Sequence, residues 1–303
     1  MPGGAIRRML PDGRRLHLQH GPIDLVIEAF GARDEIAAAY EQAWRRFQSV
    51  LTELVAELPL LRRVVDEGHC GVAGQVARRM FAACWPHRRS FITPMAAVAG
   101  AVADEVMAAM REGRALDRAY VNNGGDIALH LAPGARLDVG LVAELDHPAL
   151  TGMATIESDW PVRGVATSGW RGRSFSLGIA DAATVLAHDA AAADAAATLV
   201  ANAVDIDHPG IVRARACDID ETSDLGERWV TRGVSPLPVR LVEEALCRGA
   251  ALAESVREAG LIFGAVLVLQ GRVRVVGPVA GPAPVGAASS LMLRDMLFEH
   301  SSA

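Results

Sequence analysis

Three short runs of small and polar residues carry the side chains of this chain that could do chemistry. They are Asn-Asn-Gly-Gly-Asp at 122–126, Ala-Thr-Ser-Gly at 166–169, and an alanine-rich stretch that holds Asp194 and Thr198. Residues four apart share one face of an α-helix, so Asp194 and Thr198 would present a carboxylate and a hydroxyl one turn apart. Mg²⁺ prefers such oxygen ligands, although an ordinary surface helix can carry the same pair. A lone Asp among alanines also needs a partner if its helix is buried.

The first two runs are also typical of turns. An Asn-Gly pair between apolar segments predicts a β-hairpin, because both residues tolerate positive φ angles. Glycine in such a place would equally allow the backbone to approach a ligand closely. The Ala-Thr-Ser-Gly run is typical of a strand that ends in a Ser-Gly turn, and its hydroxyl and N–H groups could instead hold a phosphate or a planar ring. The residues alone leave both interpretations open.

The composition argues against several classes of protein. The 303 residues are 51% hydrophobic, which is enough for one large domain or two subdomains. The chain has no uncharged apolar run of membrane-spanning length and no apolar signal-peptide segment, so we expect a cytoplasmic protein without a membrane partner. The net charge is −6 and arginine pairs alternate with acidic residues, so nucleic acid is not an expected partner. The four cysteines lack C-x-x-C spacing, which argues against disulfides and zinc.

The elements that would position these runs group into blocks of strands and helices without regular β-α-β alternation, which predicts an α+β fold. Strands are expected at 16–18, 23–27, 120–131, 136–145, 153–157 and 163–169, with a last hairpin that turns at 270–271. Helices are expected from 34 to Pro59, at 95–113 behind a Thr93 cap, at 190–204 and at 239–258. We expect residues 1–276 to form the domain and 277–303 to form a Gly/Pro/Ala linker with a short helix at 291–298.

Five stretches, in order along the chain, resemble motifs of the ApbE superfamily, whose best-known members are FAD:protein FMN transferases. The stretches are VAGAVAD (98–104), NNGGD (122–126), ATSG (166–169), GIADAATV (178–185) and ADAAAT (193–198). The family motifs that they resemble are A-K-G-x-x-x-D, N-x-G-G, T-S-G, H-x-I-D-P-x-T-G and A-D-x-x-x-T. Ala99 and Gly178 replace the Lys and the His of these motifs, and Ala182 and Val185 replace a Pro and a Gly. The chain is most similar to an uncharacterised branch of the superfamily.

The resemblance implies an ApbE-like fold, with mixed and antiparallel sheets packed with helices in two closely associated subdomains. It implies that Asp194, Thr198 and the main-chain carbonyl of Val98 hold Mg²⁺. It also implies a pocket for FAD or another flavin nucleotide. The candidate residues of that pocket are Asn122, Asn123, Gly124, Gly125, Thr167, Ser168, Gly169 and Thr184. In the transferases, FMN passes to a Thr of an acceptor protein.

These observations lead to three hypotheses about function. The first is Mg²⁺-dependent flavin transfer or FAD pyrophosphate chemistry, in which Ser168 helps to position the nucleotide. The second is a non-catalytic accessory protein that binds a flavin, a nucleotide or a pterin-like ligand. The third is another reaction in which Asp126 or Asp181 acts as a general base. The candidate catalytic residues are therefore Asp126, Ser168 and Asp181. A homodimer contact through the small-residue helix at 95–110 is a further alternative to its use in a core.

Overall fold

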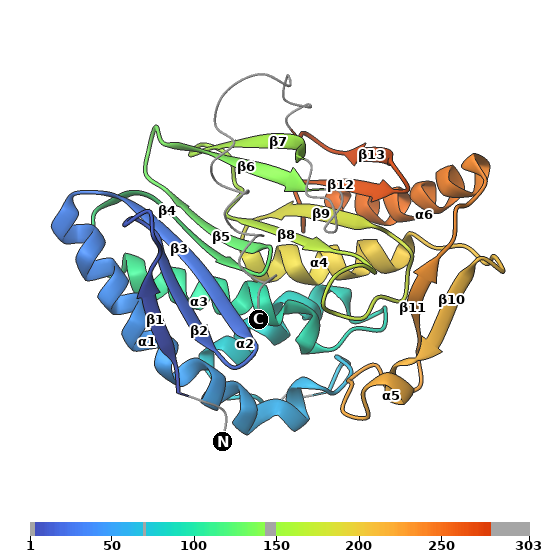
Figure 1. The fold of residues 1–303 in the computed structure, drawn as a ribbon, viewed down its shortest axis with the longest axis horizontal. Coiled ribbons are helices and arrows are strands. Elements are labelled where there is room, and N and C mark those ends of the chain that lie inside the picture. The colour runs from blue at the N-terminus through green and yellow to red at the C-terminus, as the bar shows by residue number, and fades with distance from the viewer. Residues whose placement is uncertain (1–3, 69–70, 143–149, 280–303) are drawn as a thin grey trace.

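An antiparallel sheet of nine strands runs through the computed structural model, which describes residues 4–68, 71–142 and 150–279. In spatial order its strands are β1 (Ile6–Met9), β2 (Leu16–His20), β3 (Ile23–Gly31), β4 (Leu116–Asn123), β5 (Asp126–Leu131), β8 (Gly164–Ser168), β9 (Ala182–Ala187), β12 (Gly264–Leu269) and β13 (Arg272–Val276). Every neighbouring pair is antiparallel. The spatial order follows the chain, so helices and two small ribbons are inserted between strands that remain neighbours (Figure 1).

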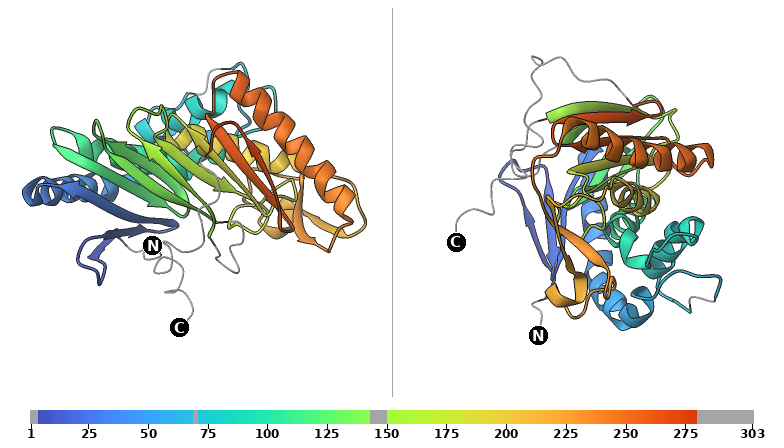
Figure 2. Two further views of the ribbon diagram at one scale, coloured as in Figure 1. Left: turned by 90° about the horizontal axis from the view of Figure 1, so that it is seen from above. Right: turned by 90° about the vertical axis from the view of Figure 1, so that its right-hand side faces the viewer.

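Helices cover one face of this sheet (Figures 1 and 2). They are α1 (Arg33–Leu61), α2 (Gln75–Cys84), α3 (Val98–Arg111), α4 (Ala190–Ala203) and α6 (Val239–Glu258), with 3₁₀ turns η1 (Trp85–His87) and η2 (Pro94–Ala97) between α2 and α3. A ribbon of β6 (Arg136–Val142) and β7 (Leu150–Glu157) packs on the opposite face. A second ribbon, β10 (Ile211–Arg215) and β11 (Trp229–Val234) with α5 (Ala216–Ile219), lies beside the sheet. Both faces of the central strands are therefore covered.

The twofold side-chain period of a strand explains how β9 is packed. Ala183 and Val185 point into the core below α4 and α6, whereas Leu186 points into the core below the β6–β7 ribbon. All six residues of β9 are buried as a result. A strand that is covered on both faces is apolar along its whole length, which is what the run Ala182–Ala187 shows.

Two helix-sheet cores lie side by side on the helix-covered face. The first joins β2, β3 and β4 to α1, α2 and α3 and includes Phe47 and Met80. The second joins β8, β9 and β12 to α4 and α6 and includes Leu246 and Leu267. The predicted α+β fold with antiparallel sheets is confirmed, and its two subdomains correspond to two cores on one continuous sheet.

Most predicted elements are present, and the differences have local causes. Helix α6 spans the predicted residues, and Gln270 (φ 45°) and Gly271 (φ 75°) form the predicted turn of the last hairpin. Pro59 lies inside α1, which ends two residues later. The predicted Thr93 cap is wrong, because the Thr93 hydroxyl donates to the carboxylate of Asp224 and a 3₁₀ turn precedes α3. The sequence patterns do not predict α2, β1 or the β10–β11 ribbon.

Several predictions concern residues that the structure describes only in part. The predicted final helix lies outside the described residues, and so does most of the predicted linker. The boundary at 276–277 stays a prediction for this reason. Within the described ranges, no helix is both long enough and apolar enough to cross a membrane.

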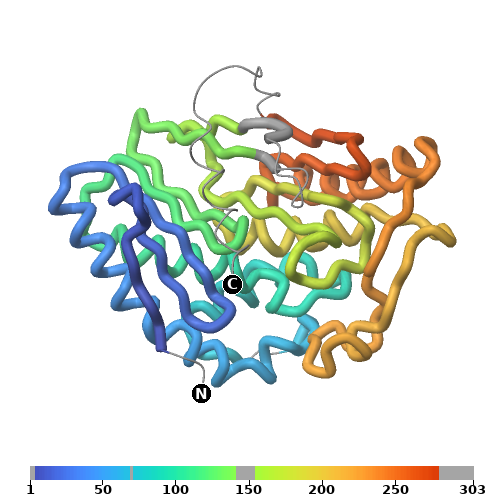
Figure 3. Tube along the Cα trace, viewed as in Figure 1, coloured from blue at the N-terminus to red at the C-terminus, as the bar shows by residue number. Residues whose placement is uncertain are grey.

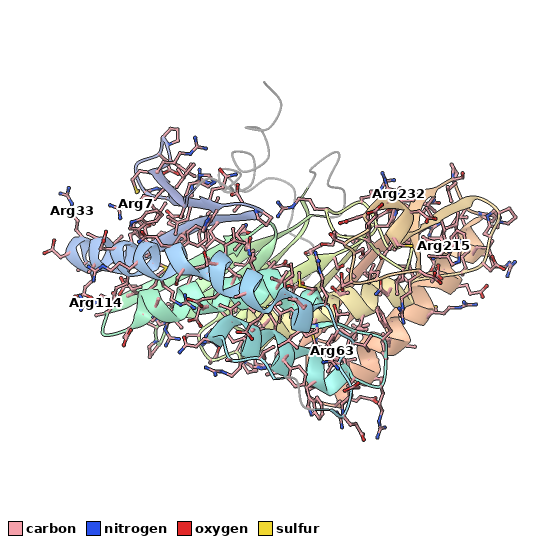
Figure 4. The ribbon with its side chains drawn as sticks, turned by 90° about the horizontal axis from the view of Figure 1, so that it is seen from below. Arg7, Arg33, Arg63, Arg114, Arg215 and Arg232 are labelled. Atoms are coloured by element: carbon pink, nitrogen blue, oxygen red, sulfur yellow. The ribbon has the colours of Figure 1, made fainter. Side chains whose placement is uncertain are left out.

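Arginines are spread around the molecule in Figure 4. The labelled ones are Arg7, Arg33, Arg63, Arg114, Arg215 and Arg232. They lie in β1, at the start of α1, just after α1, just after α3, in β10 and in β11. The absence of nucleic acid among the partners stays a prediction.

Candidate functional site

The Asn-Asn-Gly-Gly-Asp run forms the predicted hairpin. β4 and β5 are joined by Gly124 and Gly125, which have φ angles of +66° and +114°, and Asn123 pairs with Asp126 across the turn. The amide oxygen of Asn122 accepts the N–H of Gly125 at 2.8 Å. Glycine is required here because other residues rarely adopt positive φ angles.

The tip of this hairpin is tied to the start of α3. The side-chain N–H of Asn123 donates to the carbonyl oxygen of Ala99 at 3.1 Å. The next residue, Gly100, lies against the first turn of α4, where a Cβ atom would be 2.2 Å from the carbonyl oxygen of Ala190. The small residues of α3 therefore pack inside the chain, and their use in a core is confirmed.

Asp194 of α4 connects this helix to the start of α3. Its carboxylate Oδ2 accepts the main-chain N–H of Gly100 at 3.0 Å, and its side chain stays partly exposed. Asp126 is also partly exposed, and its Oδ1 accepts the N–H of Thr167 at 3.2 Å. The hairpin, β8, α3 and α4 thus bring two carboxylates into one region.

These two carboxylates influence each other's ionisation. Burial raises the pKa of Asp126 to about 7, against the hydrogen bond from Thr167 and the positive charge of Arg173. Burial and the negative charge of Asp126 raise the pKa of Asp194 well above its usual range. Two nearby carboxylates of this kind favour the binding of a proton or of a cation between them.

A third carboxylate, that of Asp104 on α3, positions α4. It accepts hydrogen bonds from the main-chain N–H groups of Ala190 at 3.0 Å and Ala191 at 2.8 Å. The Asp189 carboxylate caps the same helix by accepting the N–H of Ala192 at 2.7 Å. Burial, followed by the charge of Asp189, raises the pKa of Asp104 to about 7. The first turn of a helix attracts negative charge, so both carboxylates fix the start of the helix that carries Asp194. The motif at 98–104 contains this residue, but only the fold shows its role.

The predicted metal ligands lie on the adjoining turns of α3 and α4. Asp194 and Thr198 are one turn apart on the same face of α4, and Val98 is two residues before the Gly100 N–H that Asp194 binds. Among the described residues, no group of three or more His, Cys, Asp or Glu side chains is placed to hold a metal. A cation here would therefore depend on carboxylate, hydroxyl and main-chain oxygens with water or phosphate. The ligand role of these residues stays a prediction.

The predicted nucleotide-binding side chains divide between the two faces of the sheet. Asn123, Asp126 and Ser168 alternate with residues of the β6–β7 side, so they lie on the face covered by helices. Thr167 and Thr184 lie on the opposite face, where their hydroxyl oxygens are 2.9 Å apart. Asn122 also faces that side. Only the first group shares a face with Asp194.

Asp181 lies apart from the Asp126–Asp194 pair. Its buried carboxylate accepts the indole N–H of Trp170 at 3.1 Å and the Nε–H of Arg171 at 2.9 Å, and it also accepts the N–H of Gln270. These bonds anchor the loop between β8 and β9, in which Gly172 donates its N–H to the carbonyl of Gly169 at 3.1 Å. A catalytic role for Asp181 stays a prediction, and its observed contacts are those of an anchor.

Arg173, in the same loop, is a residue that the sequence patterns do not single out. A Cβ atom on Gly124 would lie 2.2 Å from Nη2 of Arg173, so the guanidinium lies directly over the hairpin tip. Figure 3 shows this loop leaving β8 and passing beside the β10–β11 ribbon, where the N–H of Thr231 binds the carbonyl of Ser176 at 2.9 Å. A basic residue that follows a Thr-Ser-Gly turn so closely is the signal in the sequence that could have identified it.

Comparison with protein families gives a match along most of the chain. The family model described as AbpE bacteria matches residues 7–275. A UPF0280 protein of Methanothrix thermoacetophila is 41% identical over 120 residues, which are 39% of this chain and 48% of that protein. A UPF0280 protein of Methanospirillum hungatei JF-1 is 38% identical over 118 residues, 38% of this chain and 45% of that protein. The chain thus spans about half the length of the curated relatives it matches.

Two solved structures that align with most of the chain have low sequence identity to it. A mutant of the flavin transferase ApbE from Vibrio cholerae gives a TM-score of 0.45 at 12% identity, over 90% of this chain and 97% of that one. The ApbE protein from Thermotoga maritima gives a TM-score of 0.43 at 11% identity, over 89% of this chain and 96% of that one.

Proposed function

Because this chain belongs to the family described as AbpE bacteria, we propose that it is a Mg²⁺-dependent enzyme that acts on the diphosphate of FAD or a related flavin nucleotide. The reaction would be of the FAD:protein FMN transferase type, with a hydroxyl of an acceptor protein as the attacking group. The chemistry would take place at the Asp126–Asp194 pair.

The pair of partly exposed carboxylates is the observation that carries this proposal. Both have raised pKa values, and the charge of Asp126 contributes to the shift at Asp194. A divalent cation would relieve this repulsion, and the oxygens of Asp194, Thr198 and Val98 fit a hard cation such as Mg²⁺. Bound Mg²⁺ would supply charge neutralisation at the diphosphate. The residues present therefore fit the metal that the resemblance implies.

The chain's own residues would bind the nucleotide and move one proton. Gly125 has open space where a Cβ atom would lie, so the hairpin tip leaves room for a ligand next to Asp126. The acceptor oxygen would bond to the flavin-side phosphorus as the P–O–P bond breaks and AMP leaves. Asp126, whose carboxylate lies next to this space, would be the residue that takes the acceptor proton. Ser168 shares the face on which this happens.

One observation favours the second candidate function, a protein that binds such a ligand without transferring it. Gly178 occupies the place of the family His, and a Cβ atom there would be 2.2 Å from the carbonyl oxygen of Ala201. No larger side chain fits without displacing α4, and Ala99 likewise lacks the amino group of the family Lys. If the protein transfers FMN, residues other than Ala99 and Gly178 must supply the functions of the family Lys and His.

An FAD titration with and without Mg²⁺ separates the two candidates. Flavin fluorescence would report binding. AMP release would report cleavage of the diphosphate, with a threonine-containing peptide added as the acceptor or with water as the attacking group. We expect metal-dependent binding and release, both lost in Asp194→Asn and both retained in Asp207→Asn, which changes an exposed Asp after α4. Saturable binding without AMP release would support the accessory protein instead. Failure to bind FAD under any condition would remove flavin from the proposal.

A further inference from the structure

The loop between β8 and β9 is held rigidly at its base. The N–H of Trp170 donates to the carbonyl of Ala180 at 3.0 Å, and the buried Asp181 carboxylate accepts from the side chains of Trp170 and Arg171. The Arg171 guanidinium also lies over the Trp170 ring, 4.6 Å from its centroid. These contacts hold the Arg171 side chain at the base of the loop, and the residues after Arg171 extend away from this base.

Arg173 projects from this base onto the hairpin that carries Asp126. Its Nη2 packs over Gly124, whose missing side chain leaves the necessary space. Arg173 is exposed, and it forms no hydrogen bond or ion pair with any residue that the structure describes. An Arg side chain loses considerable freedom when it is held in one place, and a guanidinium presents several N–H donors in a planar fork that matches phosphate oxygens.

Charge balance indicates what this guanidinium would bind. A divalent cation between Asp126 and Asp194 neutralises only the negative charge of the two carboxylates. A diphosphate bound at this cation would bring further negative charge, which needs another positively charged partner. Arg173 is near enough to Asp126 for its charge to act on that carboxylate, yet the two do not form a contact ion pair. The donors of the guanidinium are therefore left for a ligand in the same region.

We propose that Arg173 is a phosphate-binding residue, which clamps a diphosphate ester against the Gly124–Gly125 turn. The inference rests on the proposed function for its metal, and it adds the residue that recognises the anion. The ligand class is a nucleoside diphosphate or an ester of one, and the flavin is not required. Arg173 acts on binding, while Asp181 positions it through the base of the loop.

Calorimetric titration with inorganic pyrophosphate and Mg²⁺ tests this role directly. In Arg173→Gln we expect pyrophosphate to bind about ten-fold to a hundred-fold more weakly, because a charge-assisted hydrogen bond is lost. Arg173→Lys would keep the positive charge but not the planar fork of N–H donors. Its affinity for pyrophosphate should therefore lie between that of the unmodified protein and that of Arg173→Gln. The matched control is Arg232→Gln, an exposed arginine of β11 that stacks on Phe175 of the same loop and is labelled in Figure 4. Circular dichroism would establish that each variant is folded.

The outcomes for pyrophosphate and for FAD distinguish this inference from the proposed function. Arg173-dependent pyrophosphate binding without any FAD binding would sustain the inference and overturn the flavin proposal. FAD cleavage that is unchanged in Arg173→Gln would sustain the function and overturn the inference. Pyrophosphate binding within two-fold of the unmodified protein, or no pyrophosphate binding by that protein, would also overturn the inference.

Discussion

The main-chain N–H of Gly100 donates to the carboxylate of Asp194, and the absence of a side chain on Gly100 makes this contact accessible. The two residues belong to α3 and α4, which can approach so closely only because Gly100 lies against the carbonyl of Ala190. One glycine thereby fixes both the packing of two helices and the position of the carboxylate on which the proposed metal site depends.

Gly100→Ala should destabilise the protein and weaken the proposed metal site. The added Cβ atom would lie 2.2 Å from the Ala190 oxygen, so α3 and α4 must separate, at a cost of about 1–3 kcal/mol. Urea denaturation would measure the free energy of unfolding. Gly233→Ala is the control, because its Cβ atom would be 3.7 Å from Val212, an ordinary contact, and should change stability by less than about 0.5 kcal/mol. Equal effects of the two substitutions would contradict this account.

The acidic residues of the site predict how stability depends on pH. The pKa values of Asp104 and Asp126 rise from an ordinary 3.8 to about 7 in the folded protein, and that of Asp194 also rises. The folded state therefore binds more protons than the unfolded chain between these values. The resulting contribution to the free energy of unfolding is complete below the ordinary pKa of the unfolded chain. It is lost as the pH rises through the raised pKa of the folded protein.

Thermal denaturation of the metal-free protein from about pH 5 to about pH 8 would measure this dependence. We expect the Tm of the unmodified protein to fall more steeply with rising pH than that of Asp194→Asn, which lacks the repelling charge. Mg²⁺ should raise the Tm more at the upper end of this range, where the carboxylates are ionised. Asp207→Asn should follow the unmodified protein. Parallel profiles for the unmodified protein and Asp194→Asn would show that the pair is not coupled in this way.

Asp181→Asn distinguishes a residue that positions the loop from a general base. An amide cannot accept hydrogen bonds on both of its arms, so the Trp170, Arg171 and Gln270 contacts cannot all be kept. Because the base of the loop also places Arg173, we expect pyrophosphate to bind about ten-fold more weakly. The pH profile of any AMP release should keep its shape. Unchanged pyrophosphate binding with loss of the basic group from that profile would assign Asp181 to the chemistry instead.

Local signals predict much of this fold. The Asn-Gly pair predicts the β4–β5 turn because positive φ angles are required there, and the apolar period of α6 predicts its span of Val239–Glu258. The Thr93-Pro94 pair is misleading because a tertiary contact with Asp224 takes the hydroxyl that would have capped a helix. Short edge elements such as β1, which is exposed throughout, lack an apolar pattern that could reveal them.

The site is less accessible to prediction because several of its contacts are tertiary. The spacing of Asp194 and Thr198 is a property of one helix and can be read from the sequence. The Asp194–Gly100 bond, the Asp104 cap on α4 and the placement of Arg173 each join segments far apart in the chain. The alternation of strands could, however, have shown that Thr167 and Ser168 face opposite sides of the sheet.

Gly124→Ala tests the contact between Arg173 and the hairpin while it keeps the positive charge. The new Cβ atom would lie 2.2 Å from Nη2 of Arg173, so the flexible guanidinium must move, and the φ angle of +66° adds backbone strain of about 1–2 kcal/mol. Gly13→Ala is matched for strain, because Gly13 has a φ angle of +68° and open space around the Cβ position. Both substitutions should lower stability, but only Gly124→Ala should weaken pyrophosphate binding.

The double variant Gly124→Ala with Arg173→Gln tests whether the alanine acts on pyrophosphate binding through Arg173. If the alanine acts by displacing the guanidinium, it should have little further effect on pyrophosphate binding once the guanidinium is gone, since contacting residues are not additive. Calorimetry on the four proteins of this cycle would measure the coupling. Additive losses would mean that Gly124 acts on the ligand through the backbone of the turn alone, and the packing of Arg173 on the hairpin would then have no part in recognition.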